Sequence, residues 1–84
     1  MRIRIEEDVY EGSPADIIDD LREKNFHRDE FPDIESFLRY MRDSFVRLTD
    51  MSCTLPEGST EVRARAMIER MAEVDALEIL EDAG

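Results

Sequence analysis

The segment RIRIEEDVYEGSP, residues 2–14, decides the fold. Isoleucines alternate with charged residues at its start, and this two-residue period is typical of a strand with one buried face. Residues 9–11 contain the β-branched and aromatic side chains that suit a returning strand. Ser13 and Pro14 then favour a helix start, because serine caps a free backbone N–H and proline needs no donor at the first helical position. The segment therefore predicts a β-hairpin followed by a helix.

The two strands of this hairpin have a consistent register if residues 7–8 form the turn. Ile5 then lies opposite Tyr10, and Arg4 lies opposite Glu11, so one face is apolar and the other carries an ion pair. Each such cross-strand pair stabilises a hairpin by about 0.2–1 kcal/mol. Glu-Asp is a weaker turn signal than Asn-Gly, so this register rests on the side-chain pairing.

Three helices are predicted after the hairpin. The first begins at Pro14 and ends near Lys24. The second follows Asp33, a favourable N-cap, and has the clearest helical period in the chain. The third begins after Ser59 or Thr60. Their predicted buried positions are Ile17, Ile18 and Leu21 in the first helix, Ile34, Phe37, Leu38, Met41, Phe45 and Leu48 in the second, and Ala64, Met67, Ile68 and Met71 in the third.

A connection and a final strand complete the predicted elements. Residues 25–32 form a loop that Phe26 and Phe31 anchor to the core. Residues 77–80 alternate apolar and acidic side chains and favour a strand, in which Glu78 points outward beside an arginine of the first strand.

The whole chain, residues 1–84, is therefore expected to form a single α+β domain. Its predicted order is ββαααβ, with a small three-stranded sheet packed against three helices. The first strand of the hairpin lies in the middle of this sheet, between the returning strand and the C-terminal strand.

The charge balance restricts the function. Eleven Lys and Arg residues stand against 22 Asp and Glu residues, which gives a net charge of −11. Binding to nucleic acid or to anionic lipid needs clustered cations, so the composition argues against both. The charge instead favours solubility or attraction to a basic protein.

The same composition indicates the compartment. No stretch approaches the roughly 18 apolar residues of a membrane-spanning helix, and the first residues are too charged for a secretory signal. A single cysteine cannot form an internal disulfide, which suits a reducing environment. We therefore expect a cytoplasmic protein with no membrane association.

The sequence offers few residues for catalysis. His27, the sole histidine, lies in a polar loop beside two carboxylates. It is either a general base or, as we favour, a solvated side chain. Cys53 has the acidic neighbours Asp50 and Glu57, which raise the pKa of a thiol and disfavour a nucleophile. Neither a metal-ligand spacing nor a glycine-rich phosphate loop is present. We predict a non-enzymatic protein with no cofactor and no metal.

Two surfaces are candidates for partner binding. Tyr40 and Val46 lie outside the main apolar stripe of the second helix, near arginines, and Tyr and Arg are enriched at binding hot spots. Alternatively, they widen the buried face of that helix. Met67 on the third helix either fills the core or belongs to an adaptable interface. The second surface is an acidic row on the first helix, formed by Asp16, Asp19, Asp20 and Glu23.

These surfaces favour contact with an unidentified protein, of basic character if the acidic row steers it. The alternative function is an acidic inhibitor that mimics nucleic acid and targets a basic nucleic-acid-binding protein. Acidic runs of this kind are usually solvated faces that keep a protein soluble, and this interpretation stays open beside the two functions. A homodimer also stays open, because the edges of a small sheet can pair with another chain.

Several features of the first half of the chain occur together. A first strand is followed by VYEG at residues 9–12, then by SP at residues 13–14, which opens a helix rich in isoleucine and acids. Later, DIE at residues 33–35 begins an aromatic-bearing helix. In these features the chain resembles a loose group of short bacterial proteins of uncharacterised function. The resemblance implies a bacterial origin and an α+β fold, and it transfers no functional residue.

Overall fold

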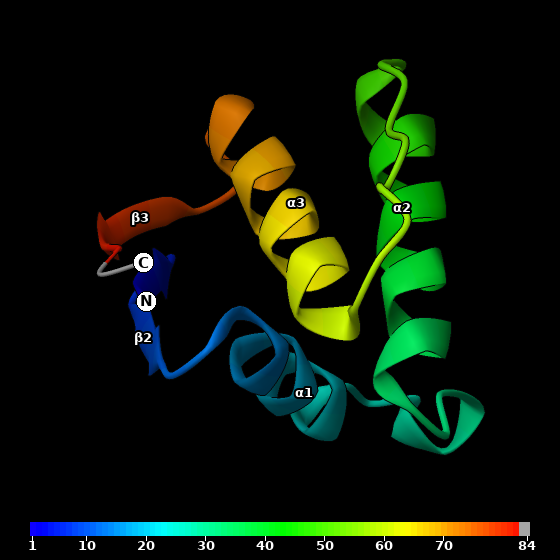
Figure 1. The fold of residues 1–84 in the computed structure, drawn as a ribbon, viewed down its shortest axis with the longest axis horizontal. Helices are drawn as coiled ribbons and strands as arrows, with labels where there is room; N and C mark the ends of the chain where they lie inside the picture. The colour runs from blue at the N-terminus through cyan, green and yellow to red at the C-terminus, as the bar shows by residue number, and fades with distance from the viewer. Residues whose placement is uncertain (83–84) are drawn as a thin grey trace.

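The predicted order of strands and helices, ββαααβ, is present in the computed structural model, which describes residues 1–82 (Figure 1). The chain is thus an α+β fold, and its three strands form an antiparallel sheet in the order β2-β1-β3, with β1 in the middle as predicted. The elements are β1 (Arg2–Ile5), β2 (Asp8–Glu11), α1 (Pro14–Lys24), the 3-10 helix η1 (Arg28–Glu30), α2 (Ile34–Thr49), α3 (Thr60–Glu73) and β3 (Glu78–Glu81).

The hairpin register differs from the predicted one by two residues. Ile3, and not Ile5, lies opposite Tyr10, and the turn begins one residue earlier, at Glu6 with φ 56°. A positive φ in a tight turn matches the twist of the two strands. A slip of two residues leaves every side chain on its face, so the apolar face is preserved. The predicted pairing of Arg4 with Glu11 is wrong, because Arg4 lies opposite Val9.

The C-terminal strand joins the free side of β1, one residue later than predicted. Leu77, just before β3, is buried, and Ile79 packs against the core. On the outer face of the sheet, Glu78 forms the predicted ion pair with Arg4 at 2.9 Å. These contacts complete the sheet, in which β1 lies between β2 and β3.

The helices form the rest of the molecule on one side of the sheet. α1 contacts β2 and packs against α3, and α2 packs against both of these helices. Figure 1 shows α2 on the side of α1 and α3 that faces away from the sheet. The core lies where these layers meet, and its buried residues are Ile3, Tyr10, Ile17, Ile18, Phe31, Phe37, Leu38, Phe45, Ala64, Met67, Ile68 and Leu77.

The helix starts are set by local capping, as predicted. Ser13 caps α1 and forms a reciprocal capping box with Asp16, with Pro14 at the first helical position. Asp33 and Ser36 form the corresponding pair at the start of α2. Ser59, rather than Thr60, caps α3. Each cap satisfies backbone donors that the helix itself leaves free.

One of the two predicted anchors of the connecting loop is wrong. Phe31 is buried, with 8% exposure, but Phe26 is 90% exposed. The ring of Phe26 lies edge-on to the ring of the adjacent His27, at 5.2 Å between centroids. The loop is held through Phe31 instead, because Arg22 on α1 donates a hydrogen bond to its carbonyl oxygen.

Candidate interaction groove

An apolar groove of about 290 Å³ lies between the second half of α2 and the C-terminal end of α3. We call it the α2–α3 groove. Its α2 side includes Tyr40, Phe45 and Leu48, and its other side is formed by Met71, Val74 and Ala76. The groove combines parts of the chain that are about thirty residues apart in sequence.

The groove arises because the apolar stripe of α2 is longer than the surface that covers it. Phe37, Leu38 and Phe45 are buried. The same period continues to Leu48 in the last turn, which was predicted to be buried but is 80% exposed. The prediction for Leu48 is therefore wrong, because the core does not extend to the end of the helix. Leu48 therefore extends the apolar lining of the groove onto the exposed surface, and contiguous exposed apolar surface can mark an interaction site.

Tyr40 lies at the opposite end of the α2 side and belongs to an aromatic cluster. Its ring centroid is 4.8 Å from that of Phe31 and 5.9 Å from that of Phe37. The two phenylalanines are buried, whereas Tyr40 is 44% exposed. Ring pairs at such distances are mutually attractive. The two buried phenylalanine rings therefore hold the Tyr40 ring in place, and its other side faces solvent.

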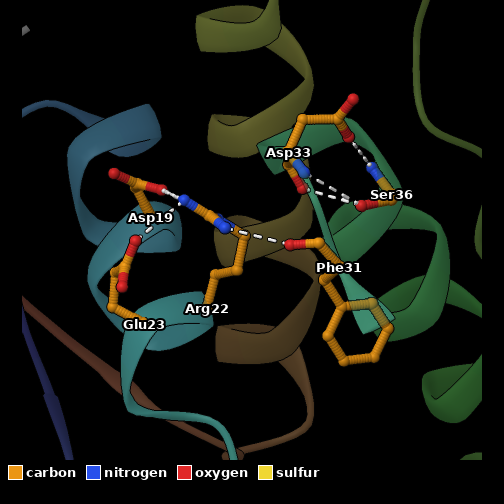
Figure 2. Close-up of polar contacts among 6 residues, drawn as sticks. All are labelled: Asp19, Arg22, Glu23, Phe31, Asp33 and Ser36. Atoms are coloured by element: carbon orange, nitrogen blue, oxygen red, sulfur yellow. Dashed lines mark hydrogen bonds and ion pairs between the residues drawn. The ribbon is translucent and has the colours of Figure 1, made fainter. Parts of the chain in front are cut away.

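Arg22 on α1 fixes this support in turn (Figure 2). Its guanidinium donates hydrogen bonds to Asp19 Oδ1 at 2.9 Å, to the Phe31 carbonyl oxygen at 2.9 Å and to Glu23 Oε1 at 3.0 Å. The side chain of Arg22 is only 17% exposed. A planar guanidinium with several donors can hold three acceptors at once. Arg22 thereby ties the loop residue Phe31, and through its ring Tyr40, to α1.

This network also changes the acidic row predicted on α1. Asp19 and Glu23 are paired with Arg22. Asp16 accepts a hydrogen bond from the Ser13 backbone N–H at 3.3 Å. Asp20 is exposed to solvent. Most of the row is thus engaged within the protein rather than presented as a uniform set of free carboxylates.

The three apolar residues predicted for partner binding have three different places. Tyr40 lines the α2–α3 groove. Val46 is 41% exposed but lies outside the groove lining. Met67 is fully buried, so its assignment to an interface is wrong, because it shares the inner face of α3 with Ala64 and Ile68. The sequence analysis did not identify Leu48 as a surface residue. The helical period of apolar residues includes Leu48 and does not show that the apolar stripe extends beyond the core.

The capping pair at the start of α2 carries a shifted pKa. Asp33 accepts a hydrogen bond from the Ser36 backbone N–H at 2.7 Å (Figure 2). This bond, followed by the interaction with the Ser36 hydroxyl, holds the pKa of Asp33 below its ordinary value of 3.8. A carboxylate that accepts such bonds is favoured in its charged form. The cap therefore keeps the first turn of α2 in place at neutral pH.

Neither of the two residues considered for catalysis belongs to the groove lining. Cys53 is half-buried, and burial raises the pKa of its thiol, although Arg70 and Arg42 oppose the shift. The pKa of Cys53 is raised, as predicted, but the main cause is burial and not the acidic neighbours. His27 is exposed, and within residues 1–82 its ring forms no hydrogen bond to a carboxylate.

Comparisons with known proteins identify no homologue of this chain. No family model, curated protein or solved structure matches the chain. The resemblance of its first half to short bacterial proteins therefore stays a prediction. Within residues 1–82 no group of three or more His, Cys, Asp or Glu side chains is arranged to hold a metal ion. The helices of the same described part are too short or too polar to cross a bilayer.

Proposed function

We propose that this protein is a small non-enzymatic interaction module that binds an apolar segment of a partner protein in the α2–α3 groove. The observation that carries the proposal is Leu48, which is 80% exposed beside the groove. Burying a leucine side chain releases about 1.5–3 kcal/mol. A partner that covered Leu48 would recover this free energy, which folding leaves unused.

The opposite end of the groove supports the same function. Tyr40 is held by two ring contacts and, through Phe31, by Arg22. A side chain that is already fixed loses little conformational entropy on binding. Tyrosine is also a frequent hot-spot residue, since it offers a large apolar ring and a polar hydroxyl.

The charge of the chain indicates the character of the partner. A net charge of −11 would attract a basic protein and accelerate its approach. The single cysteine favours a reducing compartment, and we place the protein in the bacterial cytoplasm. The alternative, an acidic mimic of nucleic acid, has less support, because Arg22 neutralises two of the four acids on α1.

The experiment compares retention of proteins from a bacterial lysate by three immobilised forms of the chain. Leu48→Ser removes the apolar group from the groove, and Val46→Ser removes one from an exposed site outside it. We expect the unmodified chain and Val46→Ser to retain the same protein at low salt, and Leu48→Ser to lose it. Circular dichroism confirms that all three fold. Equal retention by all three forms would show that the groove is not the docking site.

A further inference from the structure

The two edges of the sheet differ in how their acidic side chains are paired. On β3, Glu78 forms an ion pair with Arg4, and Glu81 forms one with Arg2 at 3.1 Å. Arg2 also lies opposite Glu11 on β2, but it pairs with the acid on β3 instead. Glu11 is exposed and forms no ion pair within residues 1–82. The arginines of β1 therefore neutralise the β3 edge and leave the β2 edge negatively charged.

The two edges also differ in regularity. β2 pairs with β1 without interruption over Asp8–Glu11, whereas the pairing of β3 with β1 is irregular between Arg2 and Ile3. An irregularity of this kind protects the edge of a sheet from pairing with a further strand. β2 is thus the edge whose backbone geometry suits an additional strand.

The hydrogen-bond pattern of the hairpin shows which backbone groups of β2 are available. The Met1 amino group donates to the Gly12 carbonyl oxygen, and the Gly12 N–H donates to the Met1 carbonyl oxygen, both at 3.0 Å. Because hydrogen-bonded and non-hydrogen-bonded pairs alternate in an antiparallel ladder, Tyr10 also bonds to β1, and Val9 and Glu11 do not. The N–H and C=O groups of Val9 and Glu11 therefore point away from β1, and in the described part of the chain nothing pairs with them. Such groups are a template for another strand.

The side chains of β2 indicate the composition of such a strand. Val9 is 54% exposed on the outer face of the sheet, and Glu7 and Glu11 lie two positions away on either side. Neither carboxylate has an ion-pair partner among residues 1–82. On the inner face, the ammonium group of Lys24 on α1 lies over the Tyr10 ring, 4.5 Å from its centre. The outer positions of an added strand thus meet an apolar residue and acids, whereas its inner position lies near a cation.

A second copy of this chain is a poor occupant of the β2 edge. Two β2 strands side by side would bring Glu7, Asp8 and Glu11 of one copy close to the same acids of the other. Like charges on neighbouring strands are destabilising, and each copy carries a net charge of −11. A strand from a basic protein turns the same interactions into attractions.

We propose that the edge of β2 is a second docking site, which binds a β-strand of a basic partner protein. That strand extends the sheet through backbone hydrogen bonds to Val9 and Glu11. Its outward positions carry an apolar side chain against Val9 and a lysine or arginine against Glu11. A slip by one residue would turn the basic side chains to the inner face, toward Lys24, so the alternation selects the partner.

The β2 edge is independent of the α2–α3 groove, because no residue of β2 lines that groove. The failure of one site therefore leaves the other intact. The two sites can be tested separately, since Leu48→Ser alters the groove without changing the sheet.

The test measures the binding of labelled synthetic peptides to the full chain by fluorescence anisotropy. The probe is a lysine–threonine–valine–threonine–lysine peptide, in which lysine and valine share one face of a strand. In a second peptide glutamine replaces lysine, and in a third the valine nitrogen is methylated, which removes a donor that faces Val9 and keeps the charge. We expect the glutamine peptide to bind about fivefold more weakly than the probe, and the methylated peptide about tenfold more weakly.

A variant of the chain tests the same contact from the other side. Glu7→Gln with Glu11→Gln should weaken binding of the probe about fivefold, because two exposed ion pairs are lost. The matched control, Glu30→Gln with Glu57→Gln, removes the same charge from exposed positions elsewhere and should leave binding nearly unchanged. Leu48→Ser should bind the probe as the unmodified chain does. Circular dichroism confirms that all forms fold.

The other outcomes overturn the inference in distinct ways. No binding of the probe would remove the β2 site and leave the groove proposal in place. Equal weakening by the control pair would reduce the effect to overall charge, and unweakened binding of the methylated peptide would show that no strand is added. Loss of binding in Leu48→Ser would assign the probe to the groove. A dimer of the chain alone that the probe dissociates would assign the edge to a second copy.

Discussion

Glu61 in the first turn of α3 accepts a hydrogen bond from the hydroxyl of Ser13, the N-cap of α1, at 2.6 Å. The same carboxylate accepts a second bond from the backbone N–H of Ala15 at 3.2 Å. Two helix starts that are 48 positions apart in the chain are thus joined by one side chain. This contact joins the N-terminal ends of α1 and α3, which pack against each other.

Glu61→Ala is expected to destabilise the fold by about 1 kcal/mol, because the backbone N–H of Ala15 loses its acceptor. Urea denaturation followed by circular dichroism measures the change in the free energy of unfolding. Glu69→Ala is the control, since Glu69 is an exposed acid on the same helix. If both substitutions changed stability equally, Glu61 would have no special role in joining α1 to α3.

Arg22→Lys is expected to loosen the loop that supports Tyr40. Lysine cannot hold Asp19, Glu23 and the Phe31 carbonyl oxygen in one plane. Loss of hydrogen bonds to a charged donor costs about 1.5–3 kcal/mol for a buried group, and partial exposure of Arg22 places the effect near the lower end. Denaturation measures this cost, and the line widths of the Tyr40 ring signals in NMR report the mobility of the groove.

Arg39→Lys is the matched control for this substitution, because Arg39 is an exposed arginine on α2. It should leave both the stability and the Tyr40 signals unchanged. Unchanged Tyr40 signals in Arg22→Lys would contradict the proposed link from Arg22 through Phe31 to the groove.

Local signals in the sequence were sufficient for most of the fold. Ser13, Asp33 and Ser59 each cap a helix through bonds to residues three positions later, so a short window of sequence contains the whole interaction. The alternation in β1 and the helical period of α2 are local in the same way. These signals placed the three strands and the three α-helices in the correct order, whereas the 3-10 helix η1 lies in a segment that was predicted to be a loop.

The errors concern contacts between distant segments. Whether Leu48 is buried or exposed depends on where α3 ends. The exposure of Phe26 depends on how Arg22 holds the loop. Neither distance along the chain nor residue type reports these arrangements. The groove could not be predicted from the sequence for the same reason, because its two sides come from helices that a long connection separates. Only Tyr40 was identified in advance, from its position outside the apolar stripe.

Met67→Ala and Leu48→Ala test the boundary between the core and the groove. Met67 is fully buried, so its truncation leaves a cavity and should destabilise the protein by about 2–5 kcal/mol. Leu48 is 80% exposed, so the same truncation should change stability by less than about 0.5 kcal/mol. Thermal or urea denaturation of both variants measures the difference. A large loss in Leu48→Ala would mean that Leu48 belongs to the core and not to a binding surface.

The cap of α2 should make stability depend on pH in the acid range. The pKa of Asp33 in the folded protein lies below its ordinary value of 3.8, because Ser36 donates hydrogen bonds to the charged form. A lowered folded pKa means that the cap contributes its full stability above the ordinary value and loses it as pH falls through the folded value.

Asp33→Asn keeps a capping side chain without this titration. The stability of the unmodified chain relative to Asp33→Asn should therefore fall when the pH drops below about 4, and denaturation curves between neutral pH and acid measure it. The other carboxylates are common to both forms, so their contributions cancel in the difference. Asp29→Asn removes an exposed carboxylate from η1 as a control, and an equal fall with this variant would show that the effect does not come from the cap.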